Sequence, residues 1–190
     1  LVGSEMCIRD SVCTEGYRIL KIKAGIDYKE DIHAMKLIRE AVGPAVRLRV
    51  DANQGYSVSS AVCALEGFKE YGIEAVEQCL PHWDMEGSAY IRKKTGGIQI
   101  MLDESIHGPV DAARACRLEA ADILNIKLMK CGGLYPAAKI NAIAEANGVT
   151  CMVGCMLAAG SFYPYSCAPE DVWAAMGRDR DNYFFIDVQS

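Results

Sequence analysis

Three carboxylates and two lysines recur along this sequence at nearly constant spacing, each at the end of a short apolar run. They are Lys23, Asp51, Glu77, Asp103 and Lys127, separated by 28, 26, 26 and 24 residues. Three carboxylates at one place repel one another strongly where the dielectric constant is low. A hard divalent cation removes that repulsion, and an all-oxygen ligand set without His or Cys suits Mg2+ better than zinc. We therefore expect a Mg2+ site at Asp51, Glu77 and Asp103. The alternative, a helix cap or a lysine partner for each acid, fits a single acid better than three.

The lysines are spaced for proton transfer. Lys21 and Lys23 share one face of an extended segment, because side chains alternate along a strand, and Ile22 faces the other way. Two neighbouring ammonium groups destabilise each other's charged form, so we expect a lowered lysine pKa and a neutral amine that acts as a base. Lys127 shares a face with Asn125 on another apolar run. The alternative interpretation of Lys127 is a solvated charge at the edge of the sheet. The pattern predicts removal of a proton next to a substrate carboxylate, with the metal stabilising the enediolate.

Short apolar runs and amphipathic runs must position these side chains, and the two kinds alternate along the chain. The expected strands are 18–23, 46–51, 75–77, 98–103, 123–128, 150–154 and 183–187, and the expected helices are 28–42, 58–71, 84–94, 109–118, 134–147 and 169–176. Strict alternation indicates parallel strands joined by crossover helices. Charges at the same end of five strands surround one mouth in a closed barrel but cannot converge in an open sheet. This favours a (β/α) barrel of the TIM type over a doubly wound sheet.

Composition limits the classes of protein to consider. The chain has 190 residues, enough to bury one sizeable core but fewer than the roughly 250 of a complete (β/α)8 barrel. A net charge of -5 gives no basic surface for nucleic acid, and no apolar run approaches the roughly 20 residues that span a membrane. We therefore expect a cytoplasmic protein with neither partner. Cysteines within the apolar stretches are expected to be small buried hydrophobes rather than disulfides: Cys63, Cys79, Cys116, Cys131 and Cys151.

The first eleven residues differ in character from the rest. Residues 1–11 resemble a translated sequencing-library adapter, and a disordered native N-terminus is the alternative. On the first interpretation, residues 12–190 form a truncated (β/α)-barrel catalytic domain. A barrel that lacks a strand has open edges, so we expect this polypeptide alone to be unstable or inactive although its parent is active.

Five runs, in order, resemble the enolase superfamily in its muconate-lactonizing-enzyme subgroup. They are KIK at 21–23, DANQG at 51–55, EQ at 77–78, LDES at 102–105 and NIKLMKCGG at 125–133. The resemblance implies that Asp51, Glu77 and Asp103 bind Mg2+. It also implies that Lys23 and Lys127 are bases on opposite faces of the substrate and that Lys21 contacts the substrate carboxylate. It further implies a homo-oligomeric parent with an N-terminal capping domain, a first barrel strand and closing C-terminal helices, which this chain lacks.

Within that subgroup, runs 125–133 and 154–157 are most similar to dipeptide epimerases, such as those acting on L-Ala-D/L-Glu. This similarity implies a dipeptide substrate, a 1,1-proton transfer and contact of Cys155 with the substrate. Dipeptide epimerases carry Asp-x-Asp on the last strand, where this chain has Asp187 and Gln189, and Asp187 is expected to line the pocket. Residues 158–180 match the family poorly, as a frameshift would produce.

Three other functions remain open on the sequence. A cycloisomerase, or an elimination of the o-succinylbenzoate synthase type, would use the same metal and lysines. A degenerate barrel without catalysis is opposed by the intact lysines and acids. A Schiff-base aldolase needs a nucleophilic lysine but has no use for three acids.

Overall fold

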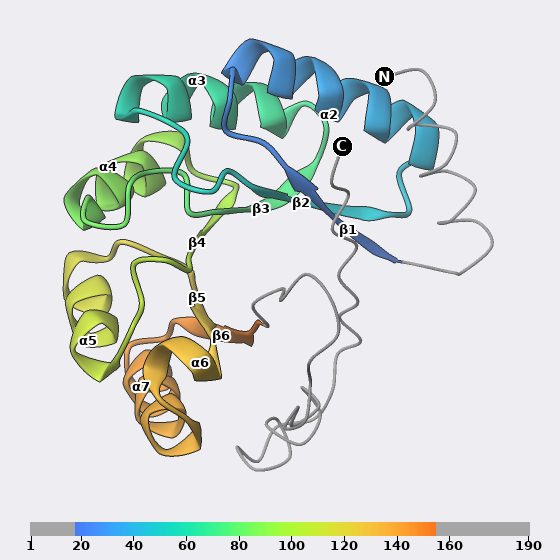
Figure 1. Ribbon diagram of the computed structural model, residues 1–190. Coiled ribbons are helices and arrows are strands. Elements are labelled where there is room, and N and C mark those ends of the chain that lie inside the picture. The colour runs from blue at the N-terminus through green and yellow to red at the C-terminus, as the bar shows by residue number, and fades with distance from the viewer. Residues whose placement is uncertain (1–17, 155–190) are drawn as a thin grey trace.

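The computed structural model describes residues 18–154, which form a curved parallel sheet covered by helices. The strands are β1 (Ile19–Lys23), β2 (Arg47–Asp51), β3 (Ile73–Glu77), β4 (Gln99–Leu102), β5 (Ile123–Ile126) and β6 (Thr150–Val153). Their order in the sheet is their order in the chain, and every neighbouring pair is parallel. The sheet bends into an arc with the helices along its outer side (Figure 1). This half-barrel confirms the predicted α/β fold with barrel-type strand order.

The helices lie close to the predicted ranges. They are α2 (Tyr28–Val42), α3 (Val58–Lys69), α4 (Met85–Thr95), α5 (Pro109–Leu118), α6 (Leu128–Cys131) and α7 (Leu134–Ala146). At the start of α2 the Asp27 carboxylate accepts the backbone N–H of Lys29 at 2.8 Å, as an N-cap does, and the helix ends at Gly43 with φ 74°. The short α6 was not predicted. The strand before it was expected to continue to residue 128, but β5 ends at Ile126 and α6 begins at Leu128. Within residues 18–154, no helix combines the length and apolar character needed to cross a membrane.

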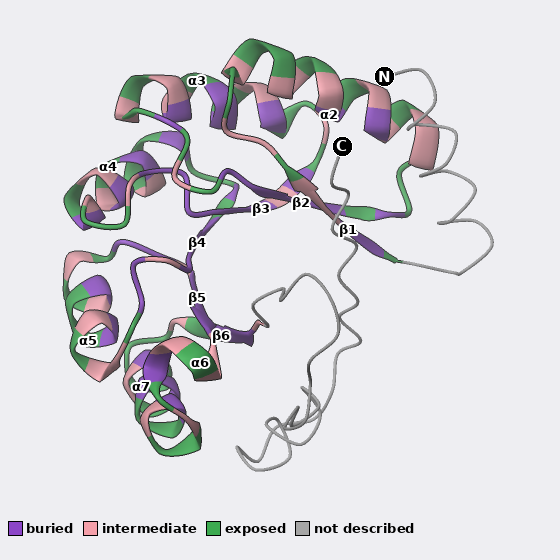
Figure 2. Cartoon of the chain, viewed as in Figure 1, coloured by how far each residue is buried: buried purple, intermediate pink, exposed green. Residues whose placement is uncertain are grey.

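The two faces of the sheet have different partners. On the outer face, strand residues such as Leu48 and Val76 pack with Phe68 of α3, and Leu124 packs with Ile140 of α7. Ile22 also packs on this side, as the alternation along β1 predicts. On the inner face a smaller apolar cluster contains Ala75, Met101, Ile123 and Met152. Figure 2 shows the buried residues along the strands and on the helix surfaces that face them. Packing between the strands and the helices forms most of the core, so the inner face of the sheet can carry polar and charged side chains.

Among the described residues, Cys63, Cys79, Cys116 and Cys131 are free thiols. Cys79, Cys131 and Cys151 are buried, as expected, and Cys116 is half-buried. Cys63 is exposed, which corrects the expectation for that residue. Its position on α3 lies off the helical stripe of buried residues (Ala61, Ala64, Leu65 and Phe68), so the amphipathic character of the helix decides its exposure.

Candidate active site

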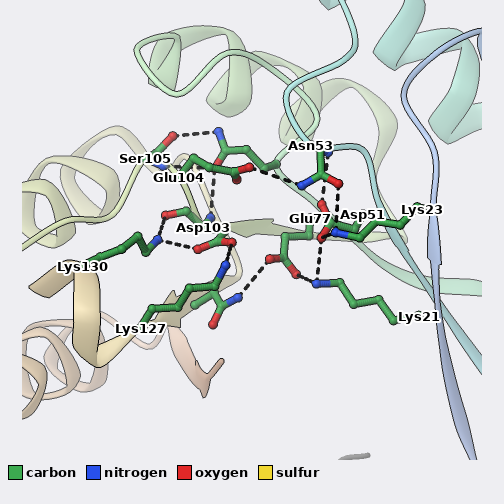
Figure 3. Close-up of polar contacts among 12 residues, drawn as sticks. Lys21, Lys23, Asp51, Asn53, Glu77, Asp103, Glu104, Ser105, Lys127 and Lys130 are labelled. Carbon is green, nitrogen blue, oxygen red and sulfur yellow. Dashed lines mark hydrogen bonds and ion pairs between the residues drawn. The ribbon is translucent and has the colours of Figure 1, made fainter. Parts of the chain in front are cut away.

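The five regularly spaced charged residues lie at one end of the sheet. Lys23, Asp51 and Glu77 are the last residues of β1, β2 and β3, while Asp103 and Lys127 directly follow β4 and β5. The carboxyl ends of parallel strands share one edge, so one βα unit of sequence separates each charge from the next. Figure 3 shows these side chains directed toward one common region. The spacing therefore predicted their common position correctly.

On one side of this region, two lysines of β1 contact two acids. Lys21 Nζ lies 2.9 Å from Asp51 Oδ2 and 2.6 Å from Glu77 Oε2. Lys23 Nζ lies 3.0 Å from the same Asp51 oxygen and donates to Asn53 Oδ1, also at 3.0 Å. The strand register explains the contact between Lys23 and Asp51, because these residues pair directly in β1 and β2. Lys21 lies two residues earlier on the same face of β1, and its side chain reaches both acids.

On the other side, two lysines contact the third acid. Lys127 Nζ donates to Asp103 Oδ2, and Lys130 Nζ donates to Asp103 Oδ1 and to its backbone oxygen. Asn125 Nδ2 donates to Glu77 Oε1 at 2.9 Å. Lys130 was not among the residues predicted to form the site. The signal was its distance of three residues from Lys127, which in the unpredicted α6 turns both lysines toward the same acid.

The three acids differ in their electrostatic state. Burial raises the pKa of Glu77 to about 7, against its ordinary 4.5, and the charges of Asp51 and Asp103 add to the effect, although Lys21 opposes it. Burial also raises the pKa of Asp51, but the ammonium groups of Lys21 and Lys23 outweigh it, so the pKa falls below its usual value. The pKa of Asp103 is lowered in the same way, by Lys130 and Lys127 against burial. Glu77 is therefore the acid of the three for which burial outweighs the neighbouring lysine.

Lys21 behaves in the opposite way to the sequence expectation. Its burial lowers its pKa, but Glu77 and Asp51 together outweigh burial and raise the pKa above its ordinary value. Attraction to these two carboxylates, whose oxygens lie 2.9 and 2.6 Å from the ammonium, is therefore what raises the pKa of Lys21. Lys21 is a positive charge at the bottom of the site, suited to binding an anion rather than to removing a proton.

The donors fit a hard cation by type, but they are not gathered into a ready-made cation site. Among residues 18–154, no three His, Cys, Asp or Glu side chains already lie close enough to hold a metal ion. Ammonium groups of the lysines lie among the carboxylates instead (Figure 3). Glu77 Oε2 is buried and lies 2.6 Å from the Lys21 ammonium, which occupies a position that a cation could take. Carboxylate oxygens from three successive strands are the ligand type that suits Mg2+.

Two predicted substrate contacts, Cys155 and Asp187, lie outside the described residues. The last described residue, Gly154, lies against the site. A Cβ atom on it would stand 2.4 Å from Asn125 Oδ1, so the backbone approaches that side chain as closely as only glycine allows.

Comparisons with known proteins identify the family to which this chain belongs. A family model described as "Enolase C-terminal domain-like" matches residues 7–187. The L-Ala-D/L-Glu epimerase of Clostridium acetobutylicum is 47% identical over 153 residues, covering 78% of this chain and 42% of the epimerase. The hydrophobic dipeptide epimerase of Enterococcus faecalis is 45% identical over 141 residues, covering 74% of this chain and 40% of that enzyme. A crystal structure of the dipeptide epimerase from Enterococcus faecalis V583 with Mg and L-Leu-L-Tyr superposes with a TM-score of 0.77, at 42% identity, over 80% of this chain and 42% of that one. The chain thus spans only about two fifths of the length of these relatives.

Proposed function

Because this chain belongs to the enolase C-terminal domain-like family, we propose that the protein containing it moves the proton on the carbon next to a substrate carboxylate, and that this substrate is a dipeptide. The observation that carries the proposal is the placement of lysines on two sides of the acids. Lys23 and Lys21 approach from β1, and Lys127 approaches from the end of β5 (Figure 3). The similarity to enzymes named as dipeptide epimerases supports the choice of substrate.

The acids are the proposed cation ligands. Asp51, Glu77 and Asp103 would hold Mg2+, and when bound it supplies a positive charge that stabilises the substrate carboxylate and the enediolate derived from it. The burial of the Glu77 carboxylate and its raised pKa support this assignment, since both indicate that its negative charge is poorly stabilised without a cation.

The two lysines at the strand ends are the proposed bases. In one direction, the neutral amine of Lys23 or Lys127 takes the α-proton, and the C–H electron pair passes into the carboxylate as an enediolate. The ammonium of the other lysine then donates a proton to the opposite face of the same carbon. The carbon is inverted, and the two lysines have exchanged protonation states, so no redox partner is needed. Lys21, positively charged between Glu77 and Asp51, would bind the substrate carboxylate.

The remaining assignments are part of the same proposal. Cys155 and Asp187 would line the substrate pocket, on the similarity of the 154–157 run to dipeptide epimerases and on the place of Asp187 in the expected last strand. Homo-oligomeric assembly and a cytoplasmic location stay predictions from the sequence.

The test is a substrate panel with the complete gene product that contains this chain. Dipeptides such as L-Ala-L-Glu and L-Leu-L-Tyr, N-succinyl amino acids and muconate would each be incubated with Mg2+ in deuterium oxide. We expect loss of the α-proton signal and appearance of the epimer for dipeptides. Turnover of an N-succinyl amino acid or of muconate, with no dipeptide epimerised, would contradict the substrate and favour an alternative of the same family.

A further inference from the structure

Gln78 connects the loops that carry the three acids. It directly follows Glu77 at the end of β3, has no exposed surface and adopts φ 40°, which is unusual for a residue other than glycine. Its backbone N–H donates to the carbonyl of Met101 on β4 at 2.9 Å. Its own carbonyl accepts the N–H of Gln54, in the loop after β2, at 2.8 Å. The backbone of this one residue therefore joins the ends of three neighbouring strands.

The side chain of Gln78 extends this connection to Asp103. Its Oε1 accepts the backbone N–H of Asp103 at 2.9 Å and that of Ser105 at 3.2 Å. Its Nε2 donates to the carbonyl of Leu80 at 2.9 Å and to Ser105 Oγ at 2.8 Å. An amide side chain has two N–H donors and two acceptor lone pairs, so every hydrogen-bonding position of Gln78 is used. Because each broken bond would leave a buried polar group unpaired, the amide is held in one orientation.

We propose that Gln78 is a positioning residue for the metal centre, which fixes the backbone of Asp103 relative to that of Glu77. No hydrogen bond or ion pair of its side chain reaches the carboxylate of either acid in the described structure, so it would act through the backbone alone. This inference rests on the proposed function, since it takes both acids as Mg2+ ligands. Partners that orient metal ligands in this way typically contribute about 10- to 100-fold in metal affinity or activity.

The test measures Mg2+ affinity by calorimetry, without substrate, on the complete gene product. Gln78→Met keeps the length of the side chain but removes its acceptor and donors, and it should raise the Kd for Mg2+ by about 10- to 100-fold. Gln78→Glu retains an oxygen acceptor for the two backbone amides and should restore most of the affinity. Thr95→Val is the matched control, because it removes a buried hydrogen bond, from Thr95 Oγ1 to the Ile91 carbonyl at 2.7 Å, within α4. It should lower the Tm and leave the Kd unchanged.

The outcomes separate the positioning role from the proposed function. An unchanged Kd in Gln78→Met, or an equal change in Thr95→Val, overturns the positioning role and leaves the metal site standing. If the unsubstituted protein binds no Mg2+, the proposed function falls and this inference falls with it. If Gln78→Met does not fold, Ser105→Ala removes one partner of the Gln78 amide without altering either acid. Weaker Mg2+ binding in Ser105→Ala then supports the positioning role, and unchanged binding overturns it.

Discussion

Asn125 on β5 donates a hydrogen bond to Glu77 on β3 at 2.9 Å, although β4 lies between these two strands in the sheet. Side chains of alternate strands meet here because the sheet is curved and both residues lie on its inner face. Lys21 lies 2.6 Å from the other oxygen of the same carboxylate. The central acid is thus held from β1 and from β5 at once, and its environment depends on the curvature of the sheet.

Replacing Asn125 tests the strength of this contact. Asn125→Leu removes the donor to a charged acceptor, and such hydrogen bonds contribute about 1.5–3 kcal/mol. We expect the free energy of unfolding to fall by about that amount at a pH well above the Glu77 pKa of about 7, where the acceptor is charged, measured by urea unfolding of the complete gene product. Asn141→Leu on α7 is the matched control. Both amides are buried and have an Oδ1 without a hydrogen-bond partner in the described structure, but only Asn125 donates there to a charged group. Equal losses in the two variants would show that the Glu77 contact contributes nothing specific.

The raised pKa of Glu77 predicts how stability depends on pH. The pKa is about 7 in the folded protein, against an ordinary value of 4.5. Between these values the folded state binds more protons than the unfolded chain, so the free energy of unfolding of the metal-free protein should decrease as pH rises from about 4.5 to about 7. Glu77→Gln stays neutral and should remove this contribution. Denaturant unfolding at a series of pH values, with a chelator present, measures both proteins, and identical pH profiles would contradict the prediction.

Magnesium should show the opposite pH dependence. A carboxylate must lose its proton before it binds a cation, so Mg2+ affinity should increase as pH rises through about 7. Chelation of the metal should stop α-proton exchange from both epimers of a dipeptide, because the enediolate loses its main stabilising charge. Exchange that persists in a chelator would rule out the metal-assisted reaction.

The two lysines should give mirror-image phenotypes. Lys127→Ala should abolish epimerisation but still allow Lys23 to exchange the α-proton of one epimer with solvent deuterium, and Lys23→Ala should allow exchange of the other epimer only. Loss of a general base typically costs about 10²–10⁴-fold in rate, which leaves one-sided exchange measurable by proton NMR. In an elimination reaction only one lysine is the base, so the two variants would not mirror each other. Equal loss of exchange from both epimers in either variant would exclude the two-base mechanism.

A close contact between two glycines predicts a sensitive position beside the site. Gly25 follows β1 and Gly55 follows β2, and a Cβ atom on Gly55 would lie 1.9 Å from the Gly25 carbonyl oxygen. Gly55→Ala must push these two loops apart, at about 1–3 kcal/mol of stability, and should also lower activity by disturbing the contact between Lys23 and Asp51. Gly108→Ala is the control, since a Cβ there meets no atom within 4 Å of the described structure. Thermal unfolding and the epimerase assay should separate the two variants, and a Gly55→Ala protein as stable and active as Gly108→Ala would contradict the prediction.

The positions of the acids and lysines could be predicted from the sequence, because they depend on the period of the βα unit. The bounds of α2 and α5 were also correct, since clear caps or a proline at the start of the helix mark them. The short α6 was missed because four residues show no helical period, and Leu128 reads as a continuation of the apolar strand before it.

The partners of those charges could not be predicted. The spacing gives the end of the sheet at which a side chain lies, but not which oxygen an ammonium reaches, since that depends on the register between strands. For this reason the sequence missed the contact of Lys130 with Asp103 and gave the wrong direction for the pKa of Lys21. The hydrogen bonds of Gln78 could not be predicted either, because they depend on how the loops after β3 and β4 fold together.

Three glycines with positive φ lie at the end of the sheet opposite the charged residues. Gly43, Gly72 and Gly148 each stand between a helix and the strand that follows it, at φ 74°, 64° and 70°. Each βα unit therefore carries its reactive charge at one end and its joint to the previous unit at the other. Gene recombination between relatives that crosses over at these glycines would exchange whole units and leave every charge at the end of its own strand. Crossovers after the strands would instead separate Asp51 from Asn53, or Glu77 from Gln78. Chimaeric barrels built from this family should accordingly be joined at the glycine turns.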